Sequence, residues 1–286
     1  MNTKTSPALL FKKPLIIYLE GYKKEAIIVS KTLKHFFNSK TRILNRNNRR
    51  RAFCVGDKRI CEYYSIIITI GGDGTFLRTA HFINKAPIIG LNPNKRKKEG
   101  FLTTTTVKEF ITLIKLLGRN EKAGKLFIDE LPRIIIRINN KKLLEKAVNE
   151  VFIGPRKSYK TIKYEIIVGN KAEEQLSSGL IIATTQGTNA WFKSSGGIPV
   201  SNSVENNKKL YFVIREPYFG RVYKPKILSG SSELIKIRMR GKGILVLDSL
   251  SDEHSLKKGD TVVLRVEPKS LKRVIIKNNS HKKQLQ

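Results

Sequence analysis

The N-terminal part of the chain begins with an apolar run followed by a segment of helical spacing. Residues 14–19 (PLIIYL) are apolar, and within residues 25–37 apolar side chains recur every three to four positions. This order is typical of a strand followed by an amphipathic helix. A second run, residues 63–70, is rich in β-branched residues and stops at Gly71 and Gly72, which terminate a strand. The pattern therefore predicts strand, helix and strand.

The next residues repeat this alternation. Residues 75–83 have helical spacing, residues 86–91 form a further apolar run, and residues 107–117 predict a helix that ends at Gly118. Strands that alternate with helices indicate a parallel sheet. We therefore predict an N-terminal, Rossmann-like α/β domain over residues 1–122.

The second half of the chain differs, because short apolar runs are separated by Gly, Asn, Lys and Pro and helical periodicity is weak. The main predicted strands are residues 131–138, 164–168, 179–184, 210–214, 234–239, 244–247 and 261–266. They indicate an antiparallel, β-rich and sandwich-like domain over residues 123–286. Residues 272–286 read as a polar, lysine-rich tail, and the chain after about residue 267 is expected to pack back on the first domain.

Composition narrows the class of protein. The chain has 286 residues, of which 40% are hydrophobic, enough for two domains with buried cores. Every apolar run is far shorter than the ~20 residues that span a bilayer, so no transmembrane helix is predicted. Residues 1–13 lack a secretory apolar core and the arginines of a transit peptide, which predicts a cytoplasmic protein. Two cysteines, Cys54 and Cys61, are too few for a disulfide framework, and no Cys/His set has zinc-ligand spacing.

The chain is strongly basic, with 56 Lys and Arg against 23 Asp and Glu and a formal charge of +33. Such a charge favours phosphate-bearing partners. It is also spread over the whole chain, so a proteome-wide compositional bias explains it equally well. The run at residues 45–51 (NRNNRRR) is interpreted as a loop, for which a solvated surface is favoured over a ligand contact. For the run of Lys95, Arg96, Lys97 and Lys98, attraction of ATP is a hypothesis beside a solvated charged loop.

The clearest chemistry lies in residues 66–77 (IIITIGGDGTFL), where a buried strand leads through a glycine-rich turn into a helix. Open α/β sheets bind ligands at this end of a strand. Glycines let the backbone approach a phosphate, and the helix N-terminus offers free N–H groups to an anion. Asp73 would repel a phosphate unless it holds a metal or accepts a proton from an attacking hydroxyl, so it indicates phosphoryl transfer. Neither the P-loop pattern nor GxGxxG fits these residues.

The GGDGT motif after a hydrophobic strand resembles one shared by NAD kinases, by diacylglycerol and sphingosine-type lipid kinases and, more distantly, by phosphofructokinases. Two later segments choose among them. Asn149 and Glu150, in AVNEVFIG, resemble the Asn-Glu pair of NAD kinases. Residues 187–191 (GTNAW) resemble the GSTAY segment of that family, with its trailing Gly-Gly at Gly196 and Gly197. The three motifs stand in the order of the NAD kinase family.

Within that family the chain is most similar to the mitochondrial-type branch. The stretch GLNPNKRKKEGFL, SSGL at residues 177–180 and IREP at residues 214–217 resemble segments of this branch. Four positions depart from the family pattern, one of them Ser178, where the common branch usually has an acidic residue before Gly-Leu. Asn189 replaces a Thr, Trp191 replaces a Tyr, and Ser249 stands after Asp248 where the family has Gly. These departures leave the preference for NAD or NADH open.

The resemblance implies transfer of the terminal phosphate of ATP to the 2′-hydroxyl of the adenosine ribose of NAD, which gives NADP and requires Mg²⁺. Asp73 would be the general base. The resemblance assigns the phosphates to Gly71, Gly72, Gly74 and Thr75, hydroxyls of the nicotinamide-side ribose to Asn149 and Glu150, and further nucleotide contacts to Gly187, Thr188, Asn189, Ala190 and Trp191. The last three would line the adenine or nicotinamide pocket, where an aromatic face stacks. A homodimer that pairs through the β-rich domain is also implied.

Two other functions compete with this interpretation. A lipid kinase shares GGDGT, and the positive charge would suit anionic membranes, but Asn149, Glu150 and GTNAW do not support it. A non-catalytic nucleic-acid-binding protein would place aromatic residues among the basic runs, and residues 45–51 and 95–98 contain none. The sequence leaves open whether ATP or polyphosphate is the donor.

Overall fold

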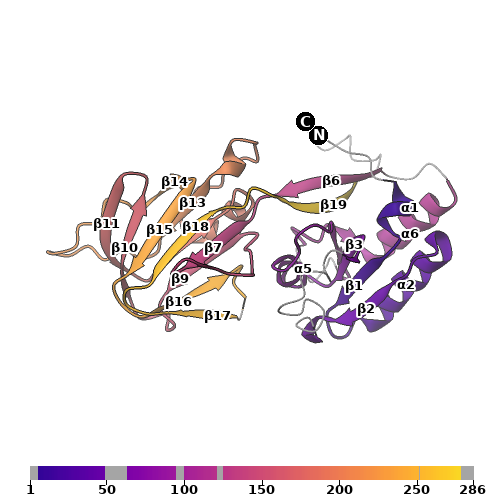
Figure 1. Ribbon diagram of the computed structural model, residues 1–286, viewed down its shortest axis with the longest axis horizontal. Helices are drawn as coiled ribbons and strands as arrows, with labels where there is room; N and C mark the ends of the chain where they lie inside the picture. Colours follow the sequence, from indigo (N-terminus) through magenta and orange to yellow (C-terminus); the bar gives the residue numbers. More distant parts are fainter. Residues whose placement is uncertain (1–5, 49–62, 95–99, 121–124, 251, 278–286) are drawn as a thin grey trace. The chain divides into compact units, whose positions relative to one another are not determined.

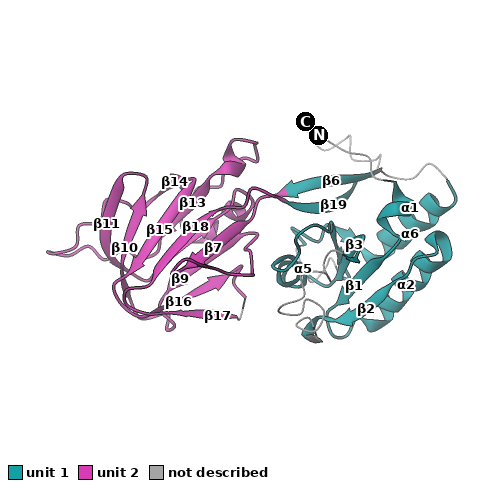
Figure 2. Ribbon diagram, viewed as in Figure 1, with its two compact units in different colours: residues 1–130, 271–286 teal, residues 131–270 magenta. Residues whose placement is uncertain are grey.

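A computed structural model describes residues 6–48, 63–94, 100–120, 125–250 and 252–277. Two compact units divide the chain (Figure 2): unit 1 contains residues 1–130 and 271–286, and unit 2 contains residues 131–270. Cys54, Cys61, residues 49–51 and the basic run 95–98 lie outside the described residues. Within the described ranges, no helix has the length and apolar character needed to cross a bilayer.

Unit 1 is built on a largely parallel sheet (Figure 1). Its strands run in the order β2-β1-β3-β4-β19-β6, with β5 beside β4. They are β1 (Pro14–Tyr18), β2 (Arg42–Asn45), β3 (Ile66–Ile70), β4 (Ile88–Asn92), β5 (Thr105–Thr106), β6 (Lys125–Leu131) and β19 (Leu271–Lys277). All five residues of β3 and of β4 are buried, as expected for central strands of a parallel sheet that is covered on both faces.

In the part of unit 1 that the structure describes, three longer helices pack on this sheet. Helices α2 (Lys23–Phe37) and α6 (Val107–Gly118) share one hydrophobic core with β1, β3 and β4. Helix α5 (Asp73–Ala80) contacts β3 and β4. The shorter helical elements are α1 (Pro7–Leu10) and η1 (Arg46–Asn48). The alternation of strands and helices predicted from the sequence is therefore confirmed.

Helix α6 begins at a capping box. Thr106 Oγ1 accepts a hydrogen bond from Glu109 N–H (3.1 Å), and Glu109 Oε2 accepts one from Thr106 N–H (2.7 Å). Because this exchange satisfies N–H groups at a helix start, Thr106→Ala should lower the free energy of unfolding by about 1 kcal/mol. Urea denaturation measures the loss, with the exposed Thr104 as matched control through Thr104→Ala. Equal urea midpoints for Thr106→Ala and Thr104→Ala would contradict a stabilising capping box at α6.

The last described strand, β19, corrects the prediction of a polar tail from residue 272. Leu271 and Val274 are buried in unit 1, and Arg273 forms an ion pair with Asp129 of β6. The strand thus brings residues 271–277 into the first sheet. With β6 as the edge strand beside it, the boundary between the units falls after residue 130 rather than near residue 122.

Unit 2 is a sandwich of antiparallel sheets. The described strands form two six-stranded sheets, ordered β11-β10-β15-β18-β7-β8 and β14-β13-β12-β9-β16-β17. The first contains β7 (Ile134–Ile138), β8 (Lys141–Lys142), β10 (Ile162–Val168), β11 (Lys171–Ser177), β15 (Leu234–Met239) and β18 (Thr261–Val266). The second contains β9 (Glu150–Gly154), β12 (Leu180–Ala183), β13 (Leu210–Ile214), β14 (Ser229–Ser232), β16 (Gly243–Leu247) and β17 (Glu253–Leu256). The predicted fold class, a parallel α/β domain followed by an antiparallel β-rich domain, is confirmed.

The core of unit 2 lies between its two sheets. Tyr164 and Ile237 from the first sheet and Ile153, Ile182 and Phe212 from the second belong to one buried cluster. The other face of the second sheet is covered by a second cluster that contains Phe152, Phe192 and partly buried Trp191. This second cluster carries the GTNAW segment, so packing fixes its place on the sheet.

A buried charged cluster ties the two ends of unit 2 together. Glu267 forms ion pairs with Arg133 (Nη2 to Oε2, 2.6 Å) and with Lys146 (Nζ to Oε1, 2.5 Å), and its N–H donates to the Arg133 carbonyl (2.7 Å). Burial lowers the pKa values of Arg133 and Lys146, and the Glu267 carboxylate opposes that shift. The cluster therefore joins the first residues of the unit to its last.

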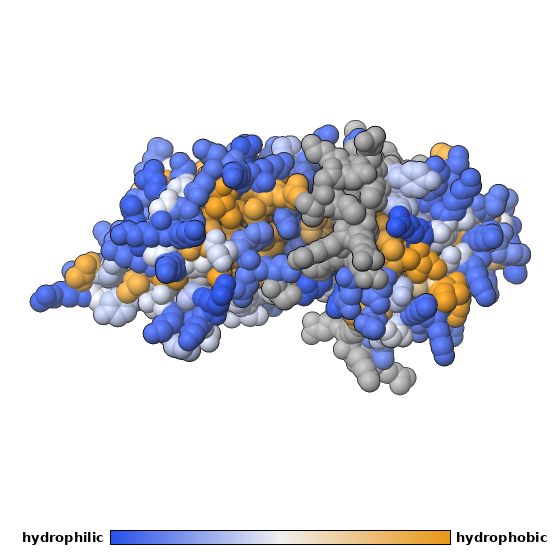
Figure 3. All heavy atoms as spheres, turned by 60° about the horizontal axis from the view of Figure 1, so that its bottom comes forward, coloured by the Kyte–Doolittle hydropathy of each residue, from blue (hydrophilic) through white to orange (hydrophobic). Residues whose placement is uncertain are grey.

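Polar side chains cover most of the face in Figure 3, and apolar side chains are exposed there in separate patches. Among the described residues, the most exposed large apolar side chains are Ile198, Val204 and Val222, each more than 80% exposed. All three lie outside the strands of unit 2.

Candidate functional site

The GGDGT motif forms the turn between β3 and α5. Gly72 is the N-cap residue of α5, which begins at Asp73. Gly71 packs directly on Thr75, since a Cβ at residue 71 would lie 2.4 Å from Thr75 Oγ1. Gly74 is exposed, and a Cβ there would meet no atom within 4 Å. The two glycines therefore differ: Gly71 allows a close contact inside the turn, and Gly74 leaves its outer surface bare.

The carboxylate of Asp73 holds the segment of residues 101–103. Oδ1 accepts hydrogen bonds from Leu102 N–H (3.1 Å), Thr103 N–H (3.0 Å) and the Thr103 hydroxyl (2.9 Å). Oδ2 accepts one from Phe101 N–H (2.8 Å). Because a carboxylate offers about four lone-pair sites, two on each oxygen, Oδ2 keeps an acceptor position. Asp73 thus fixes a neighbouring segment and can still accept a further hydrogen bond.

A pocket of about 410 Å³ opens at this turn. Its lining residues are Leu19, Arg46, Gly72, Asp73, Gly74, Thr75 and Gly100. Leu19 follows β1, Arg46 follows β2 and the GGDGT residues follow β3, and these strands are parallel neighbours. The pocket therefore lies at the carboxyl ends of the strands, where ligands bind in open α/β sheets.

Sequence reasoning missed Arg46, because residues 45–51 read as a solvent-exposed loop. Residues 42–45 instead form β2, and Arg46 begins the short helix η1. The available signal was an arginine two residues after an apolar pair, Ile43 and Leu44, which pair with Ile16 and Ile17 of β1.

In unit 2, Asn149 and Glu150 stand at the start of β9. Glu150 is 2% exposed, and its Oε1 accepts a hydrogen bond from the Ser249 hydroxyl (2.9 Å). Within the described part of the chain, Glu150 Oε2 and Asn149 Oδ1 are buried atoms without a hydrogen-bond partner. A buried polar atom left without a partner is costly. Both oxygens are therefore suited to receive hydroxyl groups of a ligand.

Asp248 fixes the backbone of this pair. Its carboxylate accepts hydrogen bonds from the N–H groups of Val148 (2.9 Å), Asn149 (2.7 Å) and Glu150 (3.1 Å). Asp248 and Ser249 have φ values of 51° and 54°, in the left-handed region that favours glycine. The left-handed backbone at residue 249 explains why the family that this chain resembles has Gly at this position. In this chain, Ser249 keeps the conformation and adds a hydroxyl that contacts Glu150.

The environment of Glu150 changes its protonation. Burial raises the pKa of its carboxyl to about 8; the neighbouring Asp248 charge adds to the rise, and the Ser249 hydrogen bond opposes it. The protonated carboxyl therefore predominates at neutral pH. It can donate a hydrogen bond as well as accept one, whereas the sequence suggested an acceptor carboxylate.

The raised pKa of Glu150 makes stability pH-dependent. The folded state binds this proton more tightly than the unfolded chain, so the contribution is complete below the ordinary pKa of 4.5 and is lost as pH rises through about 8. Glu150→Gln has no charge at residue 150 at either pH. The Tm of this variant minus the Tm of the native protein should therefore be larger at about pH 9 than at about pH 6, by roughly 2–4 °C for each kcal/mol of stability that the native protein loses. Calorimetry at both pH values measures this, with the exposed Glu233→Gln as control. The same Tm difference between Glu150→Gln and the native protein at both pH values would contradict the raised pKa.

The GTNAW segment packs on the Asn149–Glu150 pair. It forms η2 (Gln186–Asn189) and α7 (Trp191–Ser194) after β12. Thr184 N–H donates to the Asn149 carbonyl (2.9 Å), and Gly187 N–H donates to Thr184 Oγ1 (3.0 Å). A Cβ on Gly187 would lie 1.8 Å from the Asn149 carbonyl oxygen. Two motifs far apart in sequence are thus in direct contact.

Members of this segment have different environments. Thr188 is fully buried, and its hydroxyl donates to the Thr185 carbonyl (2.7 Å) and accepts from Val200 N–H (3.0 Å). Asn189 is exposed, and Ala190 is half-buried. Thr188 therefore stabilises the turn, and Asn189 is accessible to a ligand.

A second pocket, of about 480 Å³, lies beside Trp191. Phe152, Trp191, Val246, Ser249, Leu250 and Glu253 line it. The Trp191 ring packs against Phe152, with 5.1 Å between the ring centroids, and the Arg215 guanidinium lies 5.4 Å from the Trp191 centroid. Ser249 both lines this pocket and donates to Glu150, so the pocket adjoins the Asn149–Glu150 pair.

The two segments that resemble the mitochondrial-type branch meet here as well. Arg215 N–H donates to the Gly179 carbonyl (2.8 Å), and Ser178 N–H donates to the Arg215 carbonyl (3.1 Å). SSGL and IREP are therefore paired backbone segments, and Arg215 extends from them to the Trp191 ring.

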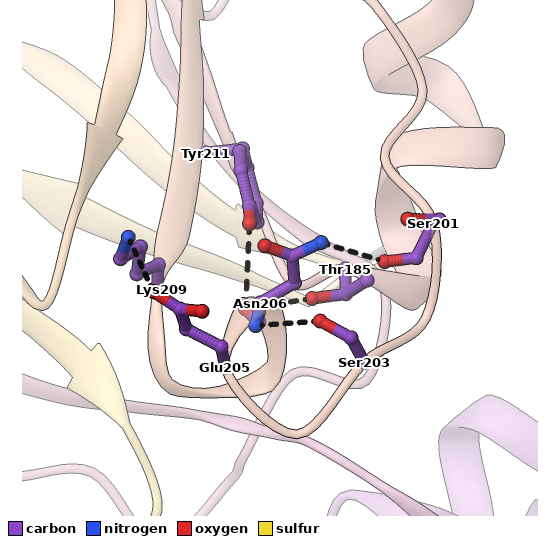
Figure 4. A network of polar contacts seen from close by, with 7 residues as sticks. All are labelled: Thr185, Ser201, Ser203, Glu205, Asn206, Lys209 and Tyr211. Carbon is purple, nitrogen blue, oxygen red and sulfur yellow. Dashed lines mark hydrogen bonds and ion pairs between the residues drawn. The ribbon is translucent and has the colours of Figure 1, made fainter.

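A polar network holds the loop that follows α7 (Figure 4). The hydroxyls of Thr185 (2.9 Å) and Tyr211 (3.4 Å) donate to the Asn206 carbonyl, and Asn206 Nδ2 donates to the Ser201 carbonyl (2.9 Å). The network joins residues 201–206 to Thr185, which directly precedes η2. It thereby supports the GTNAW turn from outside the pocket.

The glycine-rich turn of unit 1, with its carboxylate at the ends of parallel strands, is typical of a nucleotide-dependent phosphotransferase. A family model of the ATP-NAD kinase N-terminal domain matches residues 22–121. The NAD kinase of Thermoplasma acidophilum is 31% identical over 199 residues, which cover 69% of this chain and 68% of that protein. The chain belongs to the NAD kinase family, a family of enzymes.

Solved structures agree on the fold. An NAD kinase from Archaeoglobus fulgidus in complex with ATP has a TM-score of 0.64 at 21% identity, and the match covers 93% of this chain and 94% of that chain. Yeast NADH kinase complexed with NADH has a TM-score of 0.68 at 16% identity, with coverage of 94% and 84%. The comparisons do not favour a lipid kinase or a nucleic-acid-binding protein.

Proposed function

We propose that this chain transfers the terminal phosphate of ATP to the 2′-hydroxyl of the adenosine ribose of NAD, giving ADP and NADP. The observation that most supports this proposal is the GGDGT turn, where Asp73 lines an open pocket and keeps an acceptor position on Oδ2. Membership of the NAD kinase family supports the choice of donor and acceptor. The bond formed joins the 2′-oxygen to the terminal phosphorus, and the bond broken joins that phosphorus to the oxygen of ADP.

In this proposal, Asp73 is the general base. Its Oδ2 orients the 2′-hydroxyl and takes the proton as the new bond forms. The transition state of phosphoryl transfer is loose, so alignment and charge neutralisation supply most of the rate. The contacts between Asp73 Oδ1 and residues 102–103 hold the carboxylate in place for this role. Gly72, Gly74 and Thr75 bring the backbone of the turn to the phosphates.

We propose that Mg²⁺ enters with the phosphates of ATP. Among the described residues, Asp73 is the one carboxylate that lines the GGDGT pocket, and no group of three His, Cys, Asp or Glu could hold a metal ion. Mg²⁺ commonly takes one or two carboxylates together with substrate phosphates and water. The donor set here fits that arrangement, with phosphate oxygens as main ligands and Asp73 as the protein contact. The ion would neutralise charge on the transferred group.

In unit 2, we propose that the Asn149–Glu150 pair binds the hydroxyls of the nicotinamide-side ribose. Its two unpartnered oxygens support this role. The adjoining pocket would then accept the nicotinamide ring against Trp191, because Ser249 connects the pocket to Glu150. Gly187 would hold the pair in position, and Asn189 and Ala190 would lie along the nucleotide.

Three further features remain proposals. The paired SSGL and IREP segments support membership of the mitochondrial-type branch. A homodimer that pairs through unit 2 rests on the resemblance to the NAD kinase family. A cytoplasmic location stays a prediction from the sequence.

A donor and acceptor screen of the purified protein tests the proposed function. Each donor, ATP or inorganic polyphosphate, is combined with NAD, NADH, a diacylglycerol or a sphingoid base. The readouts are NADP(H), through an NADP-specific dehydrogenase, and phosphorylated lipid after extraction. We expect NADP from ATP and NAD. Phosphorylated lipid without NADP would contradict the proposal.

A further inference from the structure

The GGDGT pocket has one cationic residue in its described lining. Arg46 lies there with Asp73, Thr75, Leu19 and glycines. The resemblance to NAD kinases assigned no role to it. The residue as a whole is half-buried, and it lines the pocket.

The local structure places Arg46 at the carboxyl edge of the sheet. β2 pairs in register with β1 up to Asn45, opposite Tyr18. Asn47 N–H then donates to Asn45 Oδ1 (2.9 Å), and Asn47 Nδ2 donates to Glu20 Oε2 (3.2 Å). These contacts tie the η1 turn to the ends of both strands. The backbone of Arg46 is therefore fixed beside the pocket.

Within the described residues, Arg46 has no carboxylate as an ion-pair partner. By comparison, Arg273 of the same sheet is paired with Asp129. Asp73, the carboxylate of the pocket, is not paired with Arg46 and accepts hydrogen bonds from residues 101–103. A cation that lines a pocket without a carboxylate partner favours an anionic ligand there.

We propose that Arg46 binds the phosphates of the substrate in the GGDGT pocket, with the terminal phosphates of ATP as its ligand. A guanidinium matches the geometry of phosphate oxygens with two parallel N–H donors. It would add positive charge beside Asp73, where a multiply charged phosphate must otherwise approach a carboxylate. This inference rests on the proposed function and adds a phosphate-binding residue to it.

Steady-state kinetics of Arg46→Ala and Arg46→Lys test the proposal, with ATP and NAD varied in turn. The matched control is Lys31→Ala, which removes one positive charge from an exposed position on α2 of the same unit. We expect Arg46→Ala to raise the KM of ATP about 10-fold or more, as for loss of a charge-assisted contact. Arg46→Lys should recover part of the loss, and Lys31→Ala should match the native enzyme.

The KM values of ATP and NAD distinguish which substrate supplies the phosphate that Arg46 binds. A rise in the KM of NAD alone would support a phosphate contact but assign it to the NAD pyrophosphate. Unchanged KM and kcat for Arg46→Ala, in an active native enzyme and with a native melting temperature, would overturn the proposal. If Arg46→Ala does not fold, Arg46→Gln gives the same comparison with a similar side-chain volume.

A native protein that makes no NADP from any donor would be a failure of the proposed function, not of the Arg46 assignment. Calorimetric titration with ATP then compares the native protein with Arg46→Ala directly. Weaker binding by the variant supports the phosphate contact, and equal binding overturns it.

Discussion

Asp73→Asn should lower kcat by about 100-fold or more, the range for loss of a positioned base, while the Kd of NAD stays close to native. The amide keeps the size of the carboxylate but cannot accept the 2′-hydroxyl proton. With its oxygen at the Oδ1 position, the three hydrogen bonds from residues 102–103 survive. Its nitrogen then faces Phe101 N–H, so one hydrogen bond is lost at a cost of about 1 kcal/mol. Rapid-quench kinetics with ATP and NAD, together with calorimetric titration of NAD, measure both effects.

Thr103→Ala is the matched control for the structural role of Asp73, which is to hold residues 101–103. It removes the hydroxyl contact to Oδ1 and leaves the Asp73 carboxylate and its Oδ2 position in place. Its stability should fall about as much as that of Asp73→Asn, by about 1 kcal/mol, with kcat within a few-fold of native. If Asp73→Asn also retains near-native turnover, Asp73 is a structural cap for residues 101–103, and general-base catalysis by this residue is wrong.

Gly187→Ala should reduce the affinity for NAD by about 10- to 100-fold and destabilise unit 2 by about 1–3 kcal/mol, the range for overpacking. The added methyl group would lie 1.8 Å from the Asn149 carbonyl oxygen, so the backbone must shift. That shift moves Asn149 and Glu150, whose unpartnered oxygens are proposed to bind the ribose. The contact through Thr184 would be strained at the same time.

Gly241→Ala is the control for this substitution, because its Cβ would have no neighbour closer than 3.9 Å. Thermal unfolding and calorimetric titration of NAD compare both variants with the native protein. The KM of ATP should respond less than that of NAD in Gly187→Ala. A native Tm and a native NAD affinity in this variant would show that the GTNAW turn does not position Asn149 and Glu150.

Local patterns were enough to predict the parallel sheet and the GGDGT turn. A buried strand, a glycine turn and a helix follow one another within residues 66–80, so neighbouring residues specify the structure. Strand β19 was missed because its buried Leu271 and Val274 lie in a lysine-rich segment, and its pairing partner β4 is distant in sequence. Strand β11 (KAEEQLS) was missed because it is a charged edge strand, a common way to protect a sheet edge.

The sequence was enough to predict the motifs of the candidate site, but not the contacts that connect those motifs. Nothing local connects Asp248 with the backbone of residues 148–150, or Ser249 with Glu150. The raised pKa of Glu150 depends on those distant contacts and on burial, which tertiary packing creates. Arg46 was missed for a similar reason, since its place at the pocket follows from the register of β2 against β1.

The central claim is direct transfer of the terminal phosphate of ATP to the 2′-hydroxyl of NAD. The most direct measurement incubates the purified protein with NAD and ATP labelled in its terminal phosphate, then separates the products and locates the label by phosphorus NMR. We expect labelled NADP with the phosphate at the 2′ position, in equal amount to ADP. Formation of ADP with the label only in inorganic phosphate or lipid, and none in NADP, would contradict it.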